Sequence, residues 1–240
     1  MSVEIGPTER CEAELRDAVL SGRYEVGARL PPERTLAEDF EVGRASVRTA
    51  LTQLAAKGLL QPRQGSGYTV LDWRDAKAGI SLLGELDGAR VLDRVETARD
   101  LLRIRRHLAM ALIETLRAPD TVAIAEAIDA FDALLAGGAT LGEIAAADQN
   151  VLRALVGAAG SPVFSLALHP LLHVVQTLSW LWPALYAEPH SNVAAYRALL
   201  GWLGSHDDVS AATRRQLAAL LESRDEQTLA RLRRAVERQP

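Results

Sequence analysis

The stretch RLPPERTLAEDFEVGRASVRTALTQLAAKGLLQPRQGSGYTVL, residues 29–71, decides the fold of the N-terminal part of the chain. Within it, residues 33–40 predict a short helix, and residues 44–57 have the apolar spacing of a second helix after a Glu-Val-Gly turn. A further helix is expected upstream, over residues 9–21, because apolar side chains recur there at helical spacing. The sequence therefore predicts three helices, of which the last two are joined by a tight turn.

Two short segments after these helices predict a β-hairpin. Residues 59–63 and 68–71 are expected to be strands, and residues 64–67, Gln-Gly-Ser-Gly, form the tight loop between them. Three helices followed by a small hairpin wing are typical of a winged helix-turn-helix domain, in which one helix enters the major groove of DNA. The alternative is a structural subdomain with a solvated charged face.

Polar side chains occupy the N-terminal turns of the helix at residues 44–57, opposite its apolar side. Arginine suits contact with DNA because its planar fork binds guanine or phosphate through two hydrogen bonds. The net charge of the chain is −4, which does not indicate nucleic-acid binding. Residues 42–71, however, contain Arg44, Arg48, Lys57 and Arg63 and no acidic residue, so a local basic face can still attract phosphate groups.

Length and composition limit the class of protein. A chain of 240 residues is long enough for two modest domains, taking roughly 100–200 residues per domain. The single cysteine, Cys11, excludes an intrachain disulfide. The N-terminus lacks the apolar core of a signal peptide, and no apolar run is long enough to cross a bilayer. We therefore expect a soluble cytoplasmic protein without a membrane partner.

The remainder of the chain predicts helices only. Residues 73–90 lack a strong period and contain three glycines, so we expect a linker there, with a short helix around residues 81–86. Glycine and proline then separate helical segments over residues 91–118, 120–136, 141–158, 162–187, 190–205, 209–222 and 225–238. The expected fold class is mainly α, with a winged domain over residues 1–72 and an antiparallel bundle of six to seven helices over residues 91–240. Such bundles hold ligands between their helices.

The quoted stretch resembles, nearly position for position, the DNA-binding domain of the GntR family of bacterial transcription regulators. The family pattern is LPSERELA, then GVSRxTVRxAL, GL and RxGxGxxV. Pro32 and Gly43 stand where the family usually has serine, so a hydroxyl contact to phosphate is lost at each place, although glycine is an acceptable N-cap. The resemblance implies DNA contacts by Arg34, Gly43, Arg44, Ala45, Ser46, Arg48 and Thr49, with Gln64 and Gly65 at a wing tip that enters the minor groove.

The helical part resembles the all-helical effector domain of the FadR branch of this family, through the segment AADQNVLRALVGAAGSPVF. Many members of that branch use one aspartate and three histidines to hold a divalent metal, which in turn binds a carboxylate ligand. Here Asp148 is present, but Leu152, Tyr196 and a position near Ala218 stand where the histidines are expected. One carboxylate cannot form a metal site, since several converging ligands are needed, so we predict no metal and no other cofactor.

The founding member of the branch, a fatty-acid regulator, also lacks these metal ligands and senses long-chain acyl-CoA. The linker of this chain and its residues 147–207 resemble that protein more than the other relatives. The resemblance implies a small apolar anionic effector, with long-chain acyl-CoA as one candidate and a small organic acid as another. Leucines on two of the helices are then expected to line a tunnel, or else to be ordinary core residues. The expected effector-binding residues are Arg105, Asp148, Leu152, Trp182 and Tyr196.

Neither the histidines nor any other set of residues in the sequence predicts the active site of an enzyme. His169 and His173 are four residues apart on one predicted helix, but no acid lies beside them, and such pairs are more often core or surface residues. The sequence shows no Ser/His/Asp or Cys/His pairing and no phosphate-binding glycine loop. Our first hypothesis is a homodimeric regulator that binds a palindromic operator in double-stranded DNA and responds to an effector. The alternative is a DNA-binding protein whose helical domain only dimerises.

Overall fold

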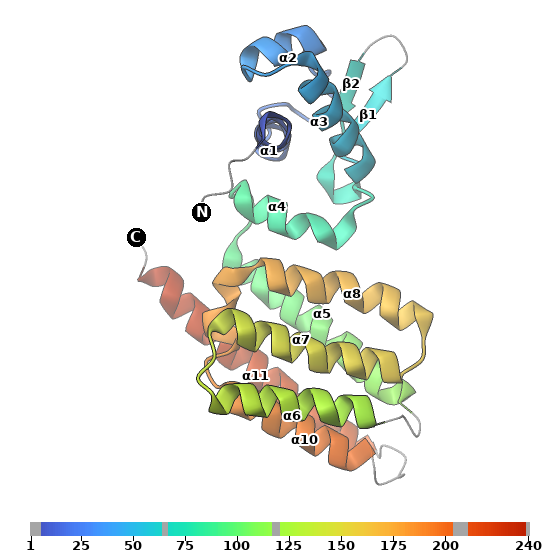
Figure 1. Ribbon diagram of the computed structural model, residues 1–240, viewed down its shortest axis with the longest axis vertical. Coiled ribbons are helices and arrows are strands. Elements are labelled where there is room, and N and C mark those ends of the chain that lie inside the picture. Colours follow the sequence, from blue (N-terminus) through green and yellow to red (C-terminus); the bar gives the residue numbers. More distant parts are fainter. Residues whose placement is uncertain (1–5, 64–66, 117–120, 204–210, 239–240) are drawn as a thin grey trace. The chain divides into compact units, whose positions relative to one another are not determined.

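The chain consists of two compact units. The computed structural model describes residues 6–63, 67–116, 121–203 and 211–238 (Figure 1). The first unit is Met1–Leu92 and the second is Asp93–Pro240. Helices dominate the described residues of both units, and the first also contains a two-stranded antiparallel sheet. The predicted mainly α fold class is thus confirmed.

The first unit has the elements of a winged helix-turn-helix. Its helices are α1 (Pro7–Leu20), α2 (Glu33–Asp39) and α3 (Arg44–Lys57), and its strands are β1 (Leu60–Arg63) and β2 (Gly67–Val70). The two strands pair with Leu60 opposite Val70 and Arg63 opposite Gly67, and Arg29 adds an isolated bridge to Thr69. The bounds of α3 are those predicted, because Gly43 precedes the helix and Gly58 ends it in the left-handed conformation, with φ +83°.

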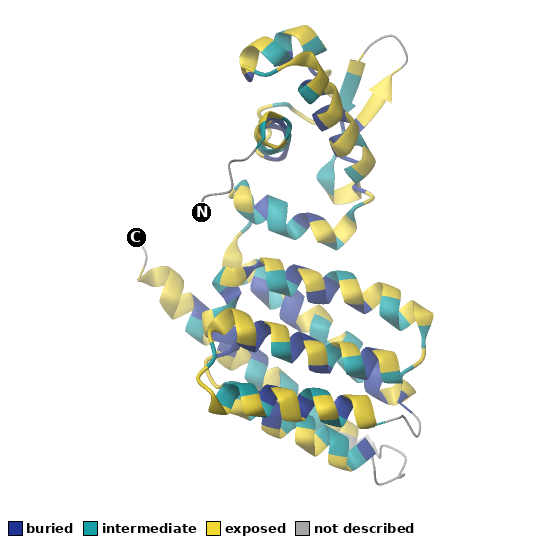
Figure 2. Cartoon of the chain, in the orientation of Figure 1, coloured by how far each residue is buried: buried dark blue, intermediate teal, exposed yellow. Residues whose placement is uncertain are grey.

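Leucines from all three helices and the hairpin form the core of this unit. Leu15 of α1, Leu36 of α2 and Leu54 of α3 are completely buried, and Leu60 of β1 is only 2% exposed. In Figure 2 dark buried positions and exposed positions both occur along α3, as expected for a helix with one buried face. Burying one such side chain stabilises the fold by about 1.5–3 kcal/mol. This cluster therefore holds α3 in a fixed orientation within the first unit.

The segment after β2, for which a linker was expected, is built into the first unit. It forms two 3-10 turns, Trp73–Asp75 and Gly79–Leu82, followed by helix α4 (Leu83–Gly88). Leu82 and Leu86 are 2% and 1% exposed and belong to the same hydrophobic core as the helix-turn-helix. Apolar burial therefore continues well beyond the hairpin.

Two contacts fasten this segment to the C-terminal end of α3. The Nζ atom of Lys57 lies 2.9 Å from Glu12 Oε1 of α1 and 2.6 Å from Glu85 Oε1 of α4. Next to it, a Cβ placed on Gly58 would lie only 2.7 Å from the backbone nitrogen of Lys77, closer than real contacts allow. Only glycine can therefore occupy position 58 without moving the chain.

The second unit is a bundle of helices, with capping side chains at several helix starts. Asp93 accepts two backbone N–H groups at the start of α5, Thr140 and Glu143 form a capping box on α7, and Ser161 caps α8. The elements in the described part are α5 (Arg94–Thr115), α6 (Val122–Ala136), α7 (Leu141–Ala158), α8 (Pro162–Thr177), a 3-10 turn (Ser179–Leu181), α9 (Trp182–Leu185), α10 (Pro189–Leu203) and α11 (Ala211–Glu237).

Three predicted helices of this unit have different bounds in the structure. The helix expected over residues 162–187 ends at Thr177, and the chain continues through a 3-10 turn to α9, which has Pro183 in its first turn. Conversely, the two helices expected over residues 209–222 and 225–238 are one helix, α11, since no glycine or proline interrupts that stretch. Every helix in the described ranges is too short or too polar to span a membrane.

Candidate functional site

One face of α3 is open to solvent over its first two turns. Arg44, Ala45, Arg48 and Thr49 are exposed, whereas Val47 on the opposite side is completely buried. The Thr49 hydroxyl donates a 3.0 Å hydrogen bond to the carbonyl oxygen of Ala45 within the helix. The buried side of α3 thus fixes the helix while its polar side remains available to a partner.

Arg48 is held in place by an acidic residue of α2. Its Nη2 and Nε atoms lie 3.0 and 3.3 Å from Oε2 of Glu33, although the arginine side chain is 73% exposed. The hydrogen bond from Arg48 to Glu33 and the charge of the carboxylate raise the pKa of the guanidinium. Arg34, on the first turn of α2, is 69% exposed and lies 3.8 Å from Glu38. Both arginines therefore keep most of their surface free for an anion.

Ser46 differs from its neighbours. It is half-buried, and its hydroxyl oxygen accepts a 3.1 Å hydrogen bond from the hydroxyl of Thr8 on α1. Gly43 is the N-cap of α3 without a side-chain cap, and the space around it is open. The structure therefore groups Gly43 with the exposed arginines and turns Ser46 towards α1. Gln64 and Gly65, the expected wing tip, lie outside the described residues.

A second candidate site is a cavity of about 170 Å³ inside the helical unit, enclosed by α5, α7, α9, α10 and α11. Most of its wall is apolar and comes from every one of these helices. The apolar wall consists of Ala109, Leu112, Ile113, Leu116, Leu152, Leu155, Leu185, Ala195, Leu199, Leu217 and Leu221. The rest of the wall is polar and contains four arginines, so the cavity has an apolar part and a charged part.

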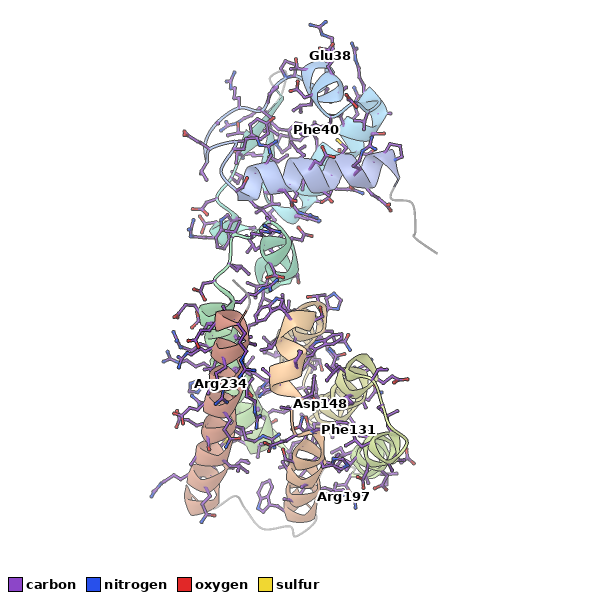
Figure 3. The ribbon with its side chains drawn as sticks, turned by 90° about the vertical axis from the view of Figure 1, so that its left-hand side faces the viewer. Glu38, Phe40, Phe131, Asp148, Arg197 and Arg234 are labelled. Carbon is purple, nitrogen blue, oxygen red and sulfur yellow. The ribbon has the colours of Figure 1, made fainter. Side chains whose placement is uncertain are left out.

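Asp148 of α7 is a buried acid of this cavity (Figure 3). It is 4% exposed and accepts hydrogen bonds from the hydroxyls of Tyr196, at 2.9 Å, and Tyr186, at 3.2 Å. Burial raises the pKa of Asp148, against the hydrogen bond from Tyr196 and the positive charge of Arg105. Burial, and next the charge of Asp148, raise the pKa of both tyrosines, so the two phenols keep their protons and act as donors.

The four arginines of the cavity have different partners. Arg105 lies 3.2 Å from Asp225, which Arg106 also approaches at 3.6 Å. Arg231 pairs with the exposed Glu188. Arg224, in contrast, donates only to neutral groups, namely the carbonyl oxygen of Ser191 at 3.0 Å and the side-chain amide oxygen of Asn192. The hydrogen bonds of Arg224 within the described chain thus all go to neutral groups, and the acid on which its charge acts is the buried Asp148.

The structure brings together four of the five residues predicted for effector binding, since Arg105, Asp148, Leu152 and Tyr196 all line the cavity. Trp182 does not line it. Its indole N–H donates a 3.0 Å hydrogen bond to the carbonyl oxygen of Val175, and its ring lies against Gly142. The break of the helix before Pro183 turns Trp182 away from the position that a continuous helix would give it.

Sequence reasoning missed several polar residues of this site, and Tyr186, Asn192 and Arg224 are among them. The signal that could have found them is a polar residue on the inward face of a helix that is otherwise apolar on that face. The sequence alone does not show which face points inward. Asn192 is 9% exposed. A side-chain amide buried to this extent normally has a specific hydrogen-bond partner, which here is Arg224. Arg224 lies in the middle of α11, at the point where a helix break was expected.

The positions expected to bear metal ligands in relatives hold other chemistry here. Leu152 supplies part of the apolar wall and Tyr196 is a hydrogen-bond donor to Asp148. His169 and His173 on α8 are exposed, and Nδ1 of His169 donates to the carbonyl oxygen of Ser165 at 2.7 Å. Among the residues that the structure describes, no group of three histidine, cysteine, aspartate or glutamate side chains is arranged to hold a metal ion.

Comparisons with known families cover both units. The family model described as bacterial regulatory proteins, gntR family, matches residues 7–70, and the FCD domain model matches residues 100–218. The solved structure of Lar, which controls the expression of the Listeria monocytogenes agr system, superposes with a TM-score of 0.56 and 13% sequence identity. It covers 97% of this chain and 99% of that chain, and so supports the fold.

Two curated relatives illustrate how the similarity is distributed. The Uxu operon transcriptional regulator of Escherichia coli is 46% identical over 66 residues, which are 28% of this chain and 26% of that protein. The fatty acid metabolism regulator protein of Edwardsiella ictaluri is 29% identical over 171 residues, 69% of this chain and 67% of the relative. The match thus spans about a quarter of the first relative and two thirds of the second. Both are named as regulators rather than enzymes, and the chain belongs to the GntR family of bacterial regulatory proteins, in its FadR-type branch with a C-terminal FCD domain.

Proposed function

We propose that this protein is a sequence-specific, DNA-binding transcription regulator that acts as a homodimer on a palindromic operator. Helix α3 would enter the major groove, with Arg44 and Arg48 at base edges or phosphates and Arg34 at the backbone. The exposure of these three arginines on one unit supports the assignment. A twofold dimer suits such a domain, because two recognition helices one helical turn apart read two half-sites.

We further infer that the cavity of the helical unit binds a small amphipathic organic anion as effector. The single observation behind this inference is the pairing, in one cavity, of an apolar wall with Arg224, a cation that has only neutral hydrogen-bond partners. An arginine is suited to grip a carboxylate through two parallel hydrogen bonds. A carboxylate at Arg224 with its hydrocarbon part among the leucines would satisfy both parts of the wall. The Asp148–Tyr186–Tyr196 cluster supplies further polar groups at this end without a metal.

The size of the cavity favours a small acid over long-chain acyl-CoA. Its volume of about 170 Å³ is below the roughly 300–1,000 Å³ of pockets for drug-sized ligands. The relative from Edwardsiella ictaluri is named for fatty acid metabolism, which is compatible with an apolar acid as the ligand class. A short or medium-length monocarboxylate therefore fits better than a long acyl chain with its carrier.

A melting-temperature series tests this proposal. A ligand that binds only the folded protein raises the melting temperature by mass action, and the rise grows with ligand concentration. We expect monocarboxylates of four to about ten carbons, an estimate scaled to the cavity, to raise it, and palmitoyl-CoA to have no effect. Arg224→Ala should abolish the rise, whereas Arg214→Ala, an exposed arginine of the same helix that lies outside the cavity, should preserve it. If no acid raises the melting temperature, the result favours a helical unit that only dimerises. If palmitoyl-CoA alone raises it, the effector is a long-chain acyl-CoA and not a small acid.

A further inference from the structure

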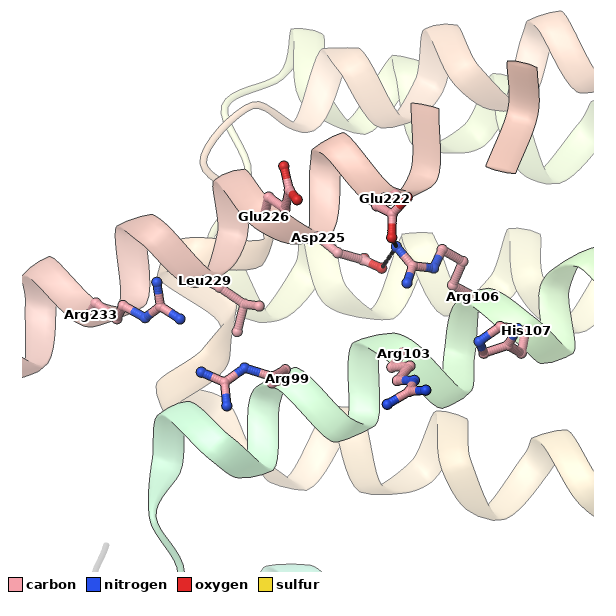
Figure 4. A pocket seen from close by; sticks show the side chains of 9 residues that line it. All are labelled: Arg99, Arg103, Arg106, His107, Glu222, Asp225, Glu226, Leu229 and Arg233. Carbon is pink, nitrogen blue, oxygen red and sulfur yellow. Dashed lines mark ion pairs between the residues drawn. The ribbon is translucent and has the colours of Figure 1, made fainter. Parts of the chain in front are cut away.

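A groove separate from the cavity runs between α5 and α11 on the surface of the helical unit (Figure 4). Its volume is about 770 Å³. Arg106 and Asp225 line both the groove and the cavity, so they form the wall between the two. The other residues of the groove are Arg99, Arg103, His107, Glu222, Glu226, Leu229 and Arg233.

Charge is unevenly distributed along this groove. At one end, Arg106 lies 3.1 Å from Glu222 and 3.6 Å from Asp225, so the two acids there are already paired. Glu226 also lines the groove, and its carboxylate points away from α5 in Figure 4. The acidic residues of the groove therefore form no ion pair with the arginines at its other end.

Arg99 and Arg233 face each other at that other end, and Arg103 lines the groove between Arg99 and Arg106. Arg99 and Arg103 are one turn apart on α5, and Figure 4 shows the guanidinium groups of Arg99 and Arg233 directed towards each other from the two helices. Arg99 pairs with Glu96, which is 60% exposed and lies outside the groove. Within the described ranges, Arg103 and Arg233 have no hydrogen-bond or ion-pair partner.

Converging positive charges are unfavourable unless an anion lies between them. Like charges one helical turn apart already destabilise a helix slightly, and a third charge across the groove adds to the repulsion. Phosphoryl groups are the anions that match several arginines at once, because their oxygens accept paired hydrogen bonds from more than one guanidinium. Leu229, 9% exposed, gives the floor an apolar patch against which the non-phosphate part of a ligand can lie.

We propose that Arg99, Arg103 and Arg233 form a binding site for a small molecule that carries phosphoryl groups, distinct from the carboxylate cavity. The site does not depend on the identity of the cavity ligand. Because Arg106 and Asp225 belong to both walls, an anion in the groove that draws on Arg106 weakens its pairing with Asp225 and thereby alters the cavity. The two ligands are therefore expected to influence each other's binding.

Inorganic pyrophosphate is a suitable probe for the full-length protein. Isothermal titration calorimetry in a buffer of constant ionic strength should give a saturable isotherm for the wild type. Arg103→Ala and Arg233→Ala should each weaken binding at least tenfold. Arg234→Ala is the matched control, because this exposed neighbour of Arg233 lies outside the groove, and it should bind as the wild type does. Circular dichroism confirms that each variant is folded.

Three results would overturn the proposal. The first is a wild-type isotherm that sodium sulfate at equal ionic strength reproduces, since that indicates general screening. The second is equal weakening by Arg234→Ala and Arg233→Ala, since that indicates only the net charge of α11. The third is loss of DNA affinity in the Arg103 and Arg233 variants without any pyrophosphate binding by the wild type, which would assign these arginines to a nucleic acid instead.

Discussion

Glu33 holds Arg48, one of the DNA contacts that we propose, in its orientation. The pair is exposed, so solvent screens the attraction and it contributes little to stability, but it restricts the arginine to one orientation. We expect Glu33→Gln to increase affinity for random DNA, because a negative charge near the phosphates disappears. The same variant should discriminate less well between a selected site and random DNA, by up to about fivefold. Fluorescence anisotropy with both duplexes measures the two effects, and an unchanged ratio of affinities would show that Glu33 does not orient Arg48.

Gly58 is the least replaceable glycine described in the first unit. A side chain there would hold the left-handed conformation at a cost of roughly 1–2 kcal/mol and would also contact the backbone of Lys77 at 2.7 Å. Gly58→Ala should therefore lower the free energy of unfolding by at least about 2 kcal/mol in urea titrations. Gly88→Ala is the control, because it lies in a helix with open space around it and should be neutral or slightly stabilising. A Gly58 variant as stable as wild type would mean that this contact relaxes without cost.

Asp148 makes the stability of the helical unit depend on pH. Burial raises its pKa above the ordinary value of 3.8, so the unfolded chain releases this proton at a lower pH than the folded protein does. Its contribution to stability therefore decreases as the pH rises from the ordinary value through the raised one. Asp148→Asn cannot ionise, and its free energy of unfolding should improve relative to wild type as the pH rises above 3.8. Asp129→Asn replaces a side chain that is 74% exposed, so its free energy of unfolding should vary with pH in parallel with that of wild type. A parallel curve for Asp148→Asn would contradict this account.

At the scale of elements, α4 belongs with the DNA-binding unit rather than with a free linker. Leu82 and Leu86 complete its core, and Lys57 joins α1, α3 and α4 through two carboxylates. Burial lowers the pKa of Lys57, but the hydrogen bonds to Glu85 and Glu12 outweigh it, and the net shift is upward, so the ammonium stays charged. The two ion pairs of Lys57 therefore couple any movement of α4 to the C-terminal end of α3.

A fragment of residues 1–92 should accordingly be more stable than a fragment of residues 1–72. Two leucines that are nearly completely buried become exposed in the shorter piece, at a cost of about 1.5–3 kcal/mol each. Thermal unfolding followed by circular dichroism should give the longer fragment the higher melting temperature. Equal melting temperatures would mean that the DNA-binding domain ends at the hairpin, as the sequence alone indicates.

These elements also show what could be predicted from the sequence. The bounds of α3 followed from Gly43 and Gly58, and the hairpin from the Gly-Ser-Gly loop, because local turn chemistry determines both. The burial of Leu86 and the inward position of Arg224 depend on which distant helix packs against them, and no local pattern contains that information. The continuity of α11 was missed because polar residues in its middle face the cavity rather than a turn.

At the scale of the whole molecule, the two units divide the chemistry of a regulator. The chain carries a net charge of −4, yet residues 42–71 have only basic charged side chains, so attraction to phosphate is a property of the first unit. The second unit contains the cavity around Asp148 and Arg224 and the groove lined by Arg99, Arg103 and Arg233. An effector changes DNA binding only if it binds the competent and incompetent arrangements with different affinity.

The affinity of α3 variants for DNA tests the central claim most directly. A duplex selected from a random library by the wild-type protein serves as the ligand, and its dissociation constant is measured at one fixed salt concentration, because phosphate contacts depend on salt. Arg44→Ala and Arg48→Ala should each lose about 1–3 kcal/mol, or roughly 5- to 150-fold in affinity. Arg23→Ala, which removes one exposed charge from the same unit outside α3, should remain close to wild type. Wild-type affinity in both α3 variants would contradict the placement of this helix in the groove.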